Sequence, residues 1–102
     1  MNRAIAFYEK YFDKKVDTFD KRYSIFIINS FSFGLFNPKQ DNEEVVFGNN
    51  VIPNIEVKDA KKEYDRVKNM GIKIALGLTD INGYQLFQFK DSEGNVIEIY
   101  SK

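Results

Sequence analysis

The side chains of this chain that could do chemistry are carboxylates, amines and hydroxyls, because none of its 102 residues is histidine or cysteine. This composition excludes a thiol nucleophile, a zinc–thiolate site, a Ser-His-Asp triad and an imidazole metal ligand. Any metal ion would need hard oxygen ligands. The remaining candidates are a carboxylate in an apolar strand, Glu98, and phenols such as Tyr84 and Tyr100, which can stack and also donate a hydrogen bond.

Charge and length narrow the class of protein further. The chain has 15 basic and 15 acidic residues, so nothing electrostatic favours nucleic acid or an anionic membrane as a partner. No apolar run reaches the roughly 18 residues of a transmembrane helix. The polar residues 8–10 interrupt the first apolar stretch, so we expect no signal peptide and a cytoplasmic protein.

The elements that must position these side chains occur in two runs of similar order. In the first half, apolar residues at helical spacing predict a helix over residues 2–13. Strands are expected at residues 16–19, 23–29 and 31–36. The polar residues 38–50 are the best candidate for a linker, although residues 45–47 could form a short strand.

The second half has the same order of elements after one additional strand. A strand is expected at residues 51–57, followed by a helix that is capped by Asp59 and ends near Gly71, a natural left-handed cap. Three more strands are expected, at residues 72–78, 84–89 and 96–100. This internal repetition suggests two modules that combine their sheets.

Particular residues in both halves resemble the vicinal oxygen chelate superfamily, which includes glyoxalase I, bleomycin-resistance proteins, fosfomycin-resistance proteins and extradiol dioxygenases. Residues 89–99, FKDSEGNVIEI, resemble the closing phrase of that family: an aromatic residue, Asp, a turn, Gly-Asn, and a Glu in an apolar strand. Residues 3–10, RAIAFYEK, resemble its first helix. The resemblance covers nearly the whole chain.

This resemblance implies an α+β fold of two βαβββ-type modules, whose sheets curve into a cup with helices outside. The first opening strand is absent, because Met1 directly precedes the first helix. We therefore expect a single domain over residues 1–102, with module one at 1–37, a linker at 38–50 and module two at 51–102.

The period of two along a strand assigns residues to the cup. Residues expected on its inner face are Ile52, Asn54, Glu56, Glu98, Tyr100 and Gly34. Glu56 could equally lie at the open rim, where a solvated Glu is ordinary. Glu98 could be a leftover carboxylate paired with Lys or Arg, a general base, or the partner of a cationic ligand.

The resemblance also implies a test for metal. Metal-dependent members use four positions, typically His or Gln, Glu, His and Glu, and only the last carries over, as Glu98. Gly34 stands at the second position, the third falls near Ile52, and the first lies on the absent strand. One carboxylate cannot hold a divalent ion against water. We therefore expect no metal, no cofactor, and no metal-dependent glyoxalase or dioxygenase activity.

The function expected from these residues is metal-free binding of a small apolar or aromatic molecule in the cup. One alternative is a metal-independent lyase or isomerase with Glu98 as general base. Another is a degenerate domain that serves only dimerisation or a protein partner.

The absent strand should leave unpaired sheet edges. Residues 45–47 could fill the gap, a second chain could cover it, or the true start could lie upstream of Met1. We expect a homodimer.

Overall fold

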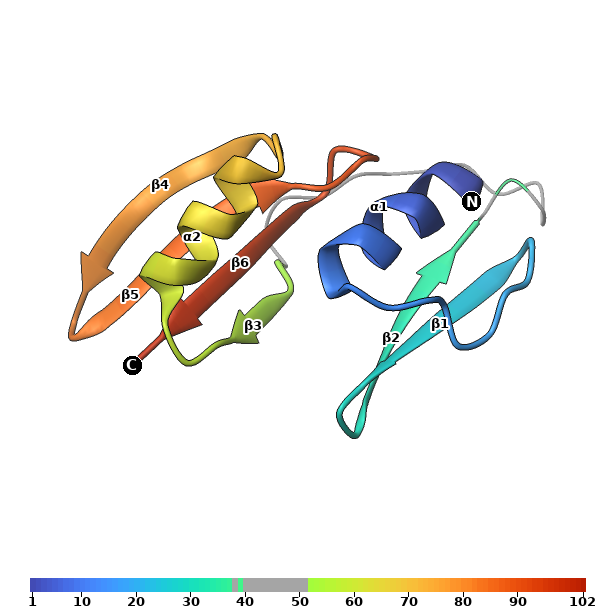
Figure 1. Ribbon diagram of the computed structural model, residues 1–102, viewed down its shortest axis with the longest axis horizontal. Coiled ribbons are helices and arrows are strands. Elements are labelled where there is room, and N and C mark those ends of the chain that lie inside the picture. The colour runs from blue at the N-terminus through green and yellow to red at the C-terminus, as the bar shows by residue number, and fades with distance from the viewer. Residues whose placement is uncertain (38, 40–51) are drawn as a thin grey trace. The chain divides into compact units, whose positions relative to one another are not determined.

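The computed structural model describes residues 1–37, 39 and 52–102. The chain divides into two compact units, Met1–Phe47 and Gly48–Lys102. The first contains α1 (Asn2–Phe12), β1 (Tyr23–Ile28) and β2 (Phe31–Phe36). The second contains β3 (Asn54–Glu56), α2 (Ala60–Asn69), β4 (Ile74–Ile81), β5 (Tyr84–Lys90) and β6 (Val96–Ser101), as Figure 1 shows. The predicted α+β class is confirmed, whereas the division into modules and linker stays a prediction.

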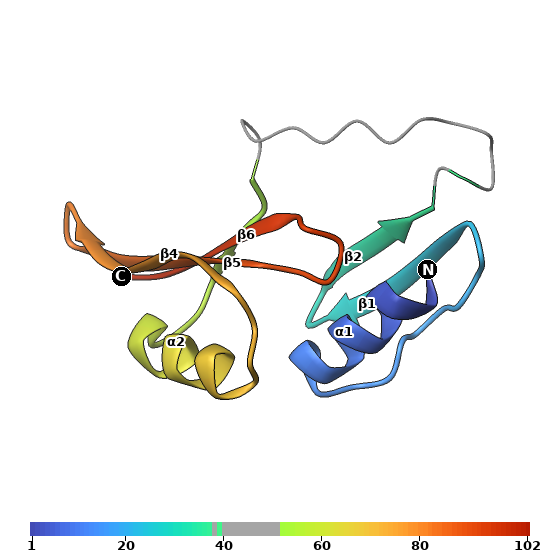
Figure 2. The ribbon, with the colours of Figure 1, turned by 90° about the horizontal axis from the view of Figure 1, so that it is seen from above.

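The second unit is one βαβββ module. Its sheet has the order β3-β6-β5-β4, with β3 parallel to β6 and the other neighbours antiparallel. Helix α2 lies on one face of this sheet, and within residues 52–102 no other helix covers the opposite face (Figure 2). We call that opposite surface the open face.

Alternation along the strands separates the core from the open face. Phe87 and Phe89 of β5 and Ile97 and Ile99 of β6 are buried, and the Tyr64 ring of α2 packs 5.2 Å from Phe87. The residues between them on β5 and β6 are half-buried and belong to the open face. The predicted pattern of strands 84–89 and 96–100 is confirmed.

Local hydrogen bonds fix the ends of these elements. The Asp59 carboxylate accepts a hydrogen bond from the Lys62 N–H at 3.2 Å, which caps α2 as predicted. Gly71 has φ 77°, so the predicted left-handed stop is confirmed. Between β5 and β6, Asp91 Oδ1 accepts hydrogen bonds from the N–H groups of Glu93 and Asn95, each at 2.9 Å. This turn sets the register of the two strands.

The first unit is a smaller assembly of a helix and a hairpin. Strands β1 and β2 pair antiparallel across the predicted turn at Asn29, whose φ is 56°. Helix α1 packs Tyr8 on this hairpin, with its ring 4.9 Å from Phe33 and 6.4 Å from Phe26. Among the described residues of this unit, no strand takes the place that β3 has in the second unit.

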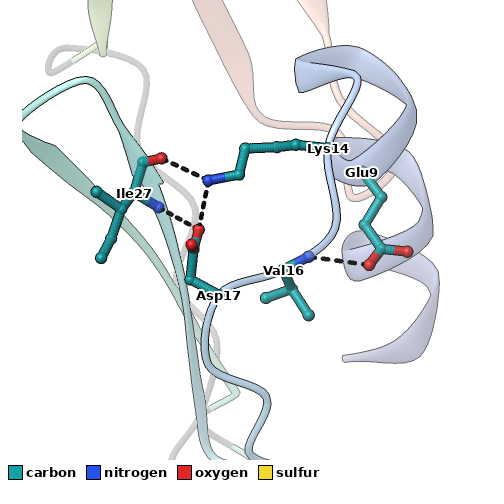
Figure 3. Close-up of polar contacts among 5 residues, drawn as sticks. All are labelled: Glu9, Lys14, Val16, Asp17 and Ile27. Atoms are coloured by element: carbon teal, nitrogen blue, oxygen red, sulfur yellow. Dashed lines mark hydrogen bonds and ion pairs between the residues drawn. The ribbon is translucent and has the colours of Figure 1, made fainter.

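The strand predicted at residues 16–19 is wrong: only a single bridge forms there, between Thr18 and Ile25. Side chains replace the rest of the ladder (Figure 3). The Ile27 N–H donates to Asp17 Oδ2 at 2.7 Å, and Lys14 Nζ donates to the Ile27 carbonyl at 2.6 Å. The Val16 N–H donates a hydrogen bond to Glu9 Oε2 at 3.0 Å and not to β1. Strand pairing therefore stops after one bridge.

Two further expectations have other outcomes. The strand predicted at residues 51–57 is shorter, Asn54–Glu56, although the Pro53 carbonyl and the Val57 N–H still bond to β6. The possible strand at residues 45–47, and the linker at 38–50 apart from Lys39, lie outside the described residues. No helix in the described ranges is long and apolar enough to cross a membrane, and the cytoplasmic location stays a prediction.

Candidate functional site

The open face of the second unit contains a hollow of about 440 Å³. All four strands of the sheet and the β4–β5 turn contribute to its surface, together with Lys102. Its lining residues are Asn54, Ile81, Asn82, Tyr84, Leu86, Glu98, Tyr100 and Lys102. The lining combines aliphatic and aromatic side chains with four polar or charged residues, and apolar walls with polar groups are found in small-molecule sites.

The one side-chain carboxylate that lines the hollow belongs to Glu98, on the strand between β3 and β5. Strand register places Asn54 beside it on β3 and Gln88 beside it on β5. Asn54 Nδ2 donates to Glu98 Oε2 at 2.6 Å, and Gln88 Nε2 donates to Oε1 at 3.0 Å. The two neutral amides thus hold the carboxylate from opposite sides.

Aromatic side chains lie next to this carboxylate. The rings of Tyr84 and Tyr100 are 6.1 Å apart with an angle of 62° between their planes, an edge-to-face pair. Leu86 stands opposite Tyr100 in the strand register and adds aliphatic surface. Such walls can stack against a flat ligand or take a ring edge.

The structure brings some of the predicted cup residues together and leaves others apart. Asn54, Glu98 and Tyr100 lie side by side in the hollow. Glu56 pairs with Tyr100 in the register but is exposed and does not line the hollow, and its position in the cup or at its rim stays a prediction. Ile52 is half-buried before β3 and is not among the lining residues either.

Gly34, the sixth predicted cup residue, belongs to β2 of the first unit. The Tyr23 phenol lies across it, so a Cβ at Gly34 would stand only 2.6 Å from Tyr23 Cζ. A side chain at this position would displace the Tyr23 ring. The position that the resemblance equates with the second metal ligand is therefore covered by the Tyr23 phenol, and the equivalence itself stays a prediction.

The sequence prediction did not include Gln88, which holds Glu98, or four of the lining residues: Ile81, Asn82, Leu86 and Lys102. Alternation along β5 could have found two of them, because Leu86 and Gln88 share a face with Tyr84.

The donor set of the hollow does not fit a divalent metal ion. In the described part of the chain, no three Asp, Glu, His or Cys residues lie close enough to hold one. Both oxygens of Glu98 already accept amide hydrogens, and its hydrogen-bonding neighbours Asn54 and Gln88 contribute no charge. Divalent sites need several oxygen ligands, usually with more than one carboxylate.

The sequence of the chain matches a known protein superfamily. Residues 1–99 match the Glyoxalase/Bleomycin resistance protein/Dioxygenase superfamily. The chain belongs to this superfamily. The resemblance seen in residues 3–10 and 89–99 is therefore confirmed. No curated protein matches the sequence.

Solved structures show the same fold. A protein described only as a conserved domain protein has 28% sequence identity and a TM-score of 0.76, over 98% of this chain and 87% of its own. Lactoylglutathione lyase from Agrobacterium tumefaciens has 17% identity and a TM-score of 0.77, over 98% and 84%. The fosfomycin resistance protein FosX from Listeria monocytogenes has 13% identity and a TM-score of 0.71, over 100% and 84%.

Proposed function

We propose that this chain binds a small apolar or aromatic molecule in the hollow of the second unit, without a metal ion. The observation that carries the proposal is an aromatic-walled hollow around one carboxylate, Glu98, which has no second acidic residue beside it in the lining. Kinship supports binding of small molecules, since solved relatives include a lactoylglutathione lyase and a fosfomycin resistance protein.

The contacts of Glu98 favour binding over general-base catalysis. A general base passes on the proton that it removes. The groups bonded to the Glu98 oxygens are the neutral amides of Asn54 and Gln88, which do not take up protons. Turnover that Glu98→Gln abolishes would reverse this preference.

We also propose that the chain functions as a homodimer through the outer edge of β2. The outer edge of β1 is occupied by Lys14 and Asp17, and the outer strands β3 and β4 carry Glu56 and Asp80. Charges of this kind discourage strand pairing between molecules. Strand β2, FSFGLF, carries no charge, so a second copy could pair with it without like-charge repulsion.

A thermal-shift screen of flat aromatic compounds, with and without Mg²⁺ or Zn²⁺, tests the binding proposal. We expect stabilisation by some of these compounds that does not depend on the metal ion. Tyr84→Ala should then weaken the best compound by roughly tenfold through the loss of ring contact.

The matched control is Tyr23→Ala, because Tyr23 and Tyr84 are similarly exposed, at 47% and 42%, and only Tyr84 lines the hollow. Tyr23→Ala should leave the affinity unchanged. Stabilisation that requires a divalent ion would overturn the metal-free site, and equal losses in the two variants would overturn its location.

A further inference from the structure

The charge of Glu98 has no cationic partner in the described ranges of the chain. Its side-chain hydrogen bonds come from two neutral amides, those of Asn54 and Gln88. The ion pairs seen on the surface, such as Lys61–Asp65 and Arg66–Glu63, do not include it. Glu98 is half-buried, and a partly desolvated negative charge favours a cationic partner more strongly than an exposed one does.

The carboxylate also keeps acceptor capacity toward the hollow. Each carboxylate oxygen offers about two lone-pair sites. Each amide uses one site, so roughly one remains on each oxygen. Because Glu98 lines the hollow, a molecule bound there can reach these sites with N–H donors. Hydrogen bonds between an ionised donor and a carboxylate are about twice as strong as neutral ones.

The rings beside Glu98 suit the same kind of ligand. Tyr84 and Tyr100 form an edge-to-face pair at 6.1 Å, and both line the hollow. A protonated nitrogen near a tyrosine face gains cation–π attraction, while an attached flat group can stack on the other ring. Leu86 extends the apolar surface for that group.

Lys102 is the one cationic side chain in the lining, and it could instead attract an anion. It is exposed at the end of the sequence, whereas Glu98 is half-buried at the middle of three strands. Solvent and salt screen an exposed charge more than a partly buried one. Selectivity should therefore follow Glu98.

We propose that the ligand of this hollow is an aromatic molecule that carries a protonated amine, with the amine on Glu98 and the ring against the Tyr84–Tyr100 pair. This inference rests on the proposed binding function and specifies the ligand class. Asn54 and Gln88 are positioning residues that hold the carboxylate toward the amine.

Three probes with one ring system and different charge test the inference: 2-naphthylmethylamine, 2-naphthylmethanol and 2-naphthoate. Titration calorimetry on the full chain at pH 7 should show the amine binding roughly tenfold more tightly than the alcohol. The carboxylate should bind most weakly. Added salt should reduce the preference for the amine.

Variants locate the effect. In Glu98→Gln the ratio of amine to alcohol affinity should fall close to one, because the charge is lost while the size is kept. Glu56→Gln is the matched control, since Glu56 pairs with Tyr100 on the neighbouring strand but lies outside the hollow. It should keep the wild-type ratio. Thermal melting checks that both variants fold. If one variant does not fold, the ratio of amine to alcohol affinity in the wild-type chain still tests the inference.

The outcomes separate the two proposals. Equal binding of amine and alcohol would overturn the inference and leave the binding of apolar molecules intact. Tightest binding of 2-naphthoate would overturn it in favour of Lys102. If none of the three probes binds, both the inference and the proposed function fail.

Discussion

The closing strands β2 and β6 hold the same place in the internal repeat but have different neighbours. Strand β6 pairs with β5 on one side and with the parallel strand β3 on the other. Among the described residues, β2 pairs only with β1. In the second unit β3 precedes α2, whereas α1 is the first element described in the first unit.

The consequence is seen in the exposure of apolar side chains. In the first unit, Phe31 is 62% exposed and Phe36 48% exposed, both on β2. On β6 the residues Ile97 and Ile99 are buried, and none of its residues is exposed. The opening strand of such a module thus forms hydrogen bonds with backbone groups of the closing strand. It also shields apolar side chains of the closing strand from solvent.

The largest effect expected from this comparison is on independent folding. A fragment of residues 48–102 should fold alone, because it keeps a four-stranded sheet and its helix. A fragment of residues 1–47 should stay largely unfolded, since one hairpin and one helix bury too little apolar surface at this size. Amide dispersion in NMR spectra of both fragments measures the difference. Well-dispersed spectra from both would show that β2 needs no further strand.

The next effect concerns association through β2. Sedimentation velocity at micromolar concentration should show a dimer, and Ser32→Lys should weaken it roughly tenfold or more, because like charges meet at the symmetric edge. Ser32 is exposed on β2, so the change should not disturb the core.

Thr18→Lys is the matched control, on the β1 side that Lys14 and Asp17 already occupy. It should leave the dimer intact. A monomeric wild-type chain would show that the expected homodimer is wrong, and equal loss in both variants would place the contact elsewhere.

Much of the fold could be predicted because local patterns and the final packing agree. Both helices, the left-handed stop at Gly71 and the buried faces of β5 and β6 followed from the spacing of apolar residues and from cap chemistry. The strand at residues 16–19 failed because Lys14 and Asp17 side chains compete for the backbone of Ile27. A pattern of apolar residues carries no information about that competition.

For the site, the alternation of side chains along each strand predicts which residues share a face of the sheet, but not which of them are in contact. Parity placed Asn54, Glu98 and Tyr100 on one face, and the structure brings these three together. Parity also puts Gln88 on the face of Tyr84, but its hydrogen bond to Glu98 depends on the register between β5 and β6, which the hydrogen-bonded turn at Asp91 sets. Register is a property of paired strands, and neither strand specifies it alone.

The smallest expected effect is a difference in pH response between the two units. The N–H of Ile27 and the ammonium of Lys14 lower the pKa of Asp17 below its ordinary value of 3.8. In the second unit, the Asp65 carboxylate raises the pKa of Lys61 above its ordinary value of 10.5. The first contribution is complete above the unfolded pKa of Asp17 and disappears as pH falls through the folded pKa. The second is complete below the unfolded pKa of Lys61 and disappears as pH rises through the folded pKa.

Acid should therefore destabilise the first unit through protonation of Asp17. Strong base should destabilise the second unit through deprotonation of Lys61. NMR titration should give an Asp17 midpoint below 3.8, with the amide signal of Ile27 moving at the same pH. Asp17→Asn should remove the movement of that amide, and the exposed Asp65→Asn should preserve it. An Asp17 midpoint at or above the ordinary value would mean that Lys14 and Asp17 do not hold the β1 edge in solution, and the contrast between the β1 and β2 edges would then disappear.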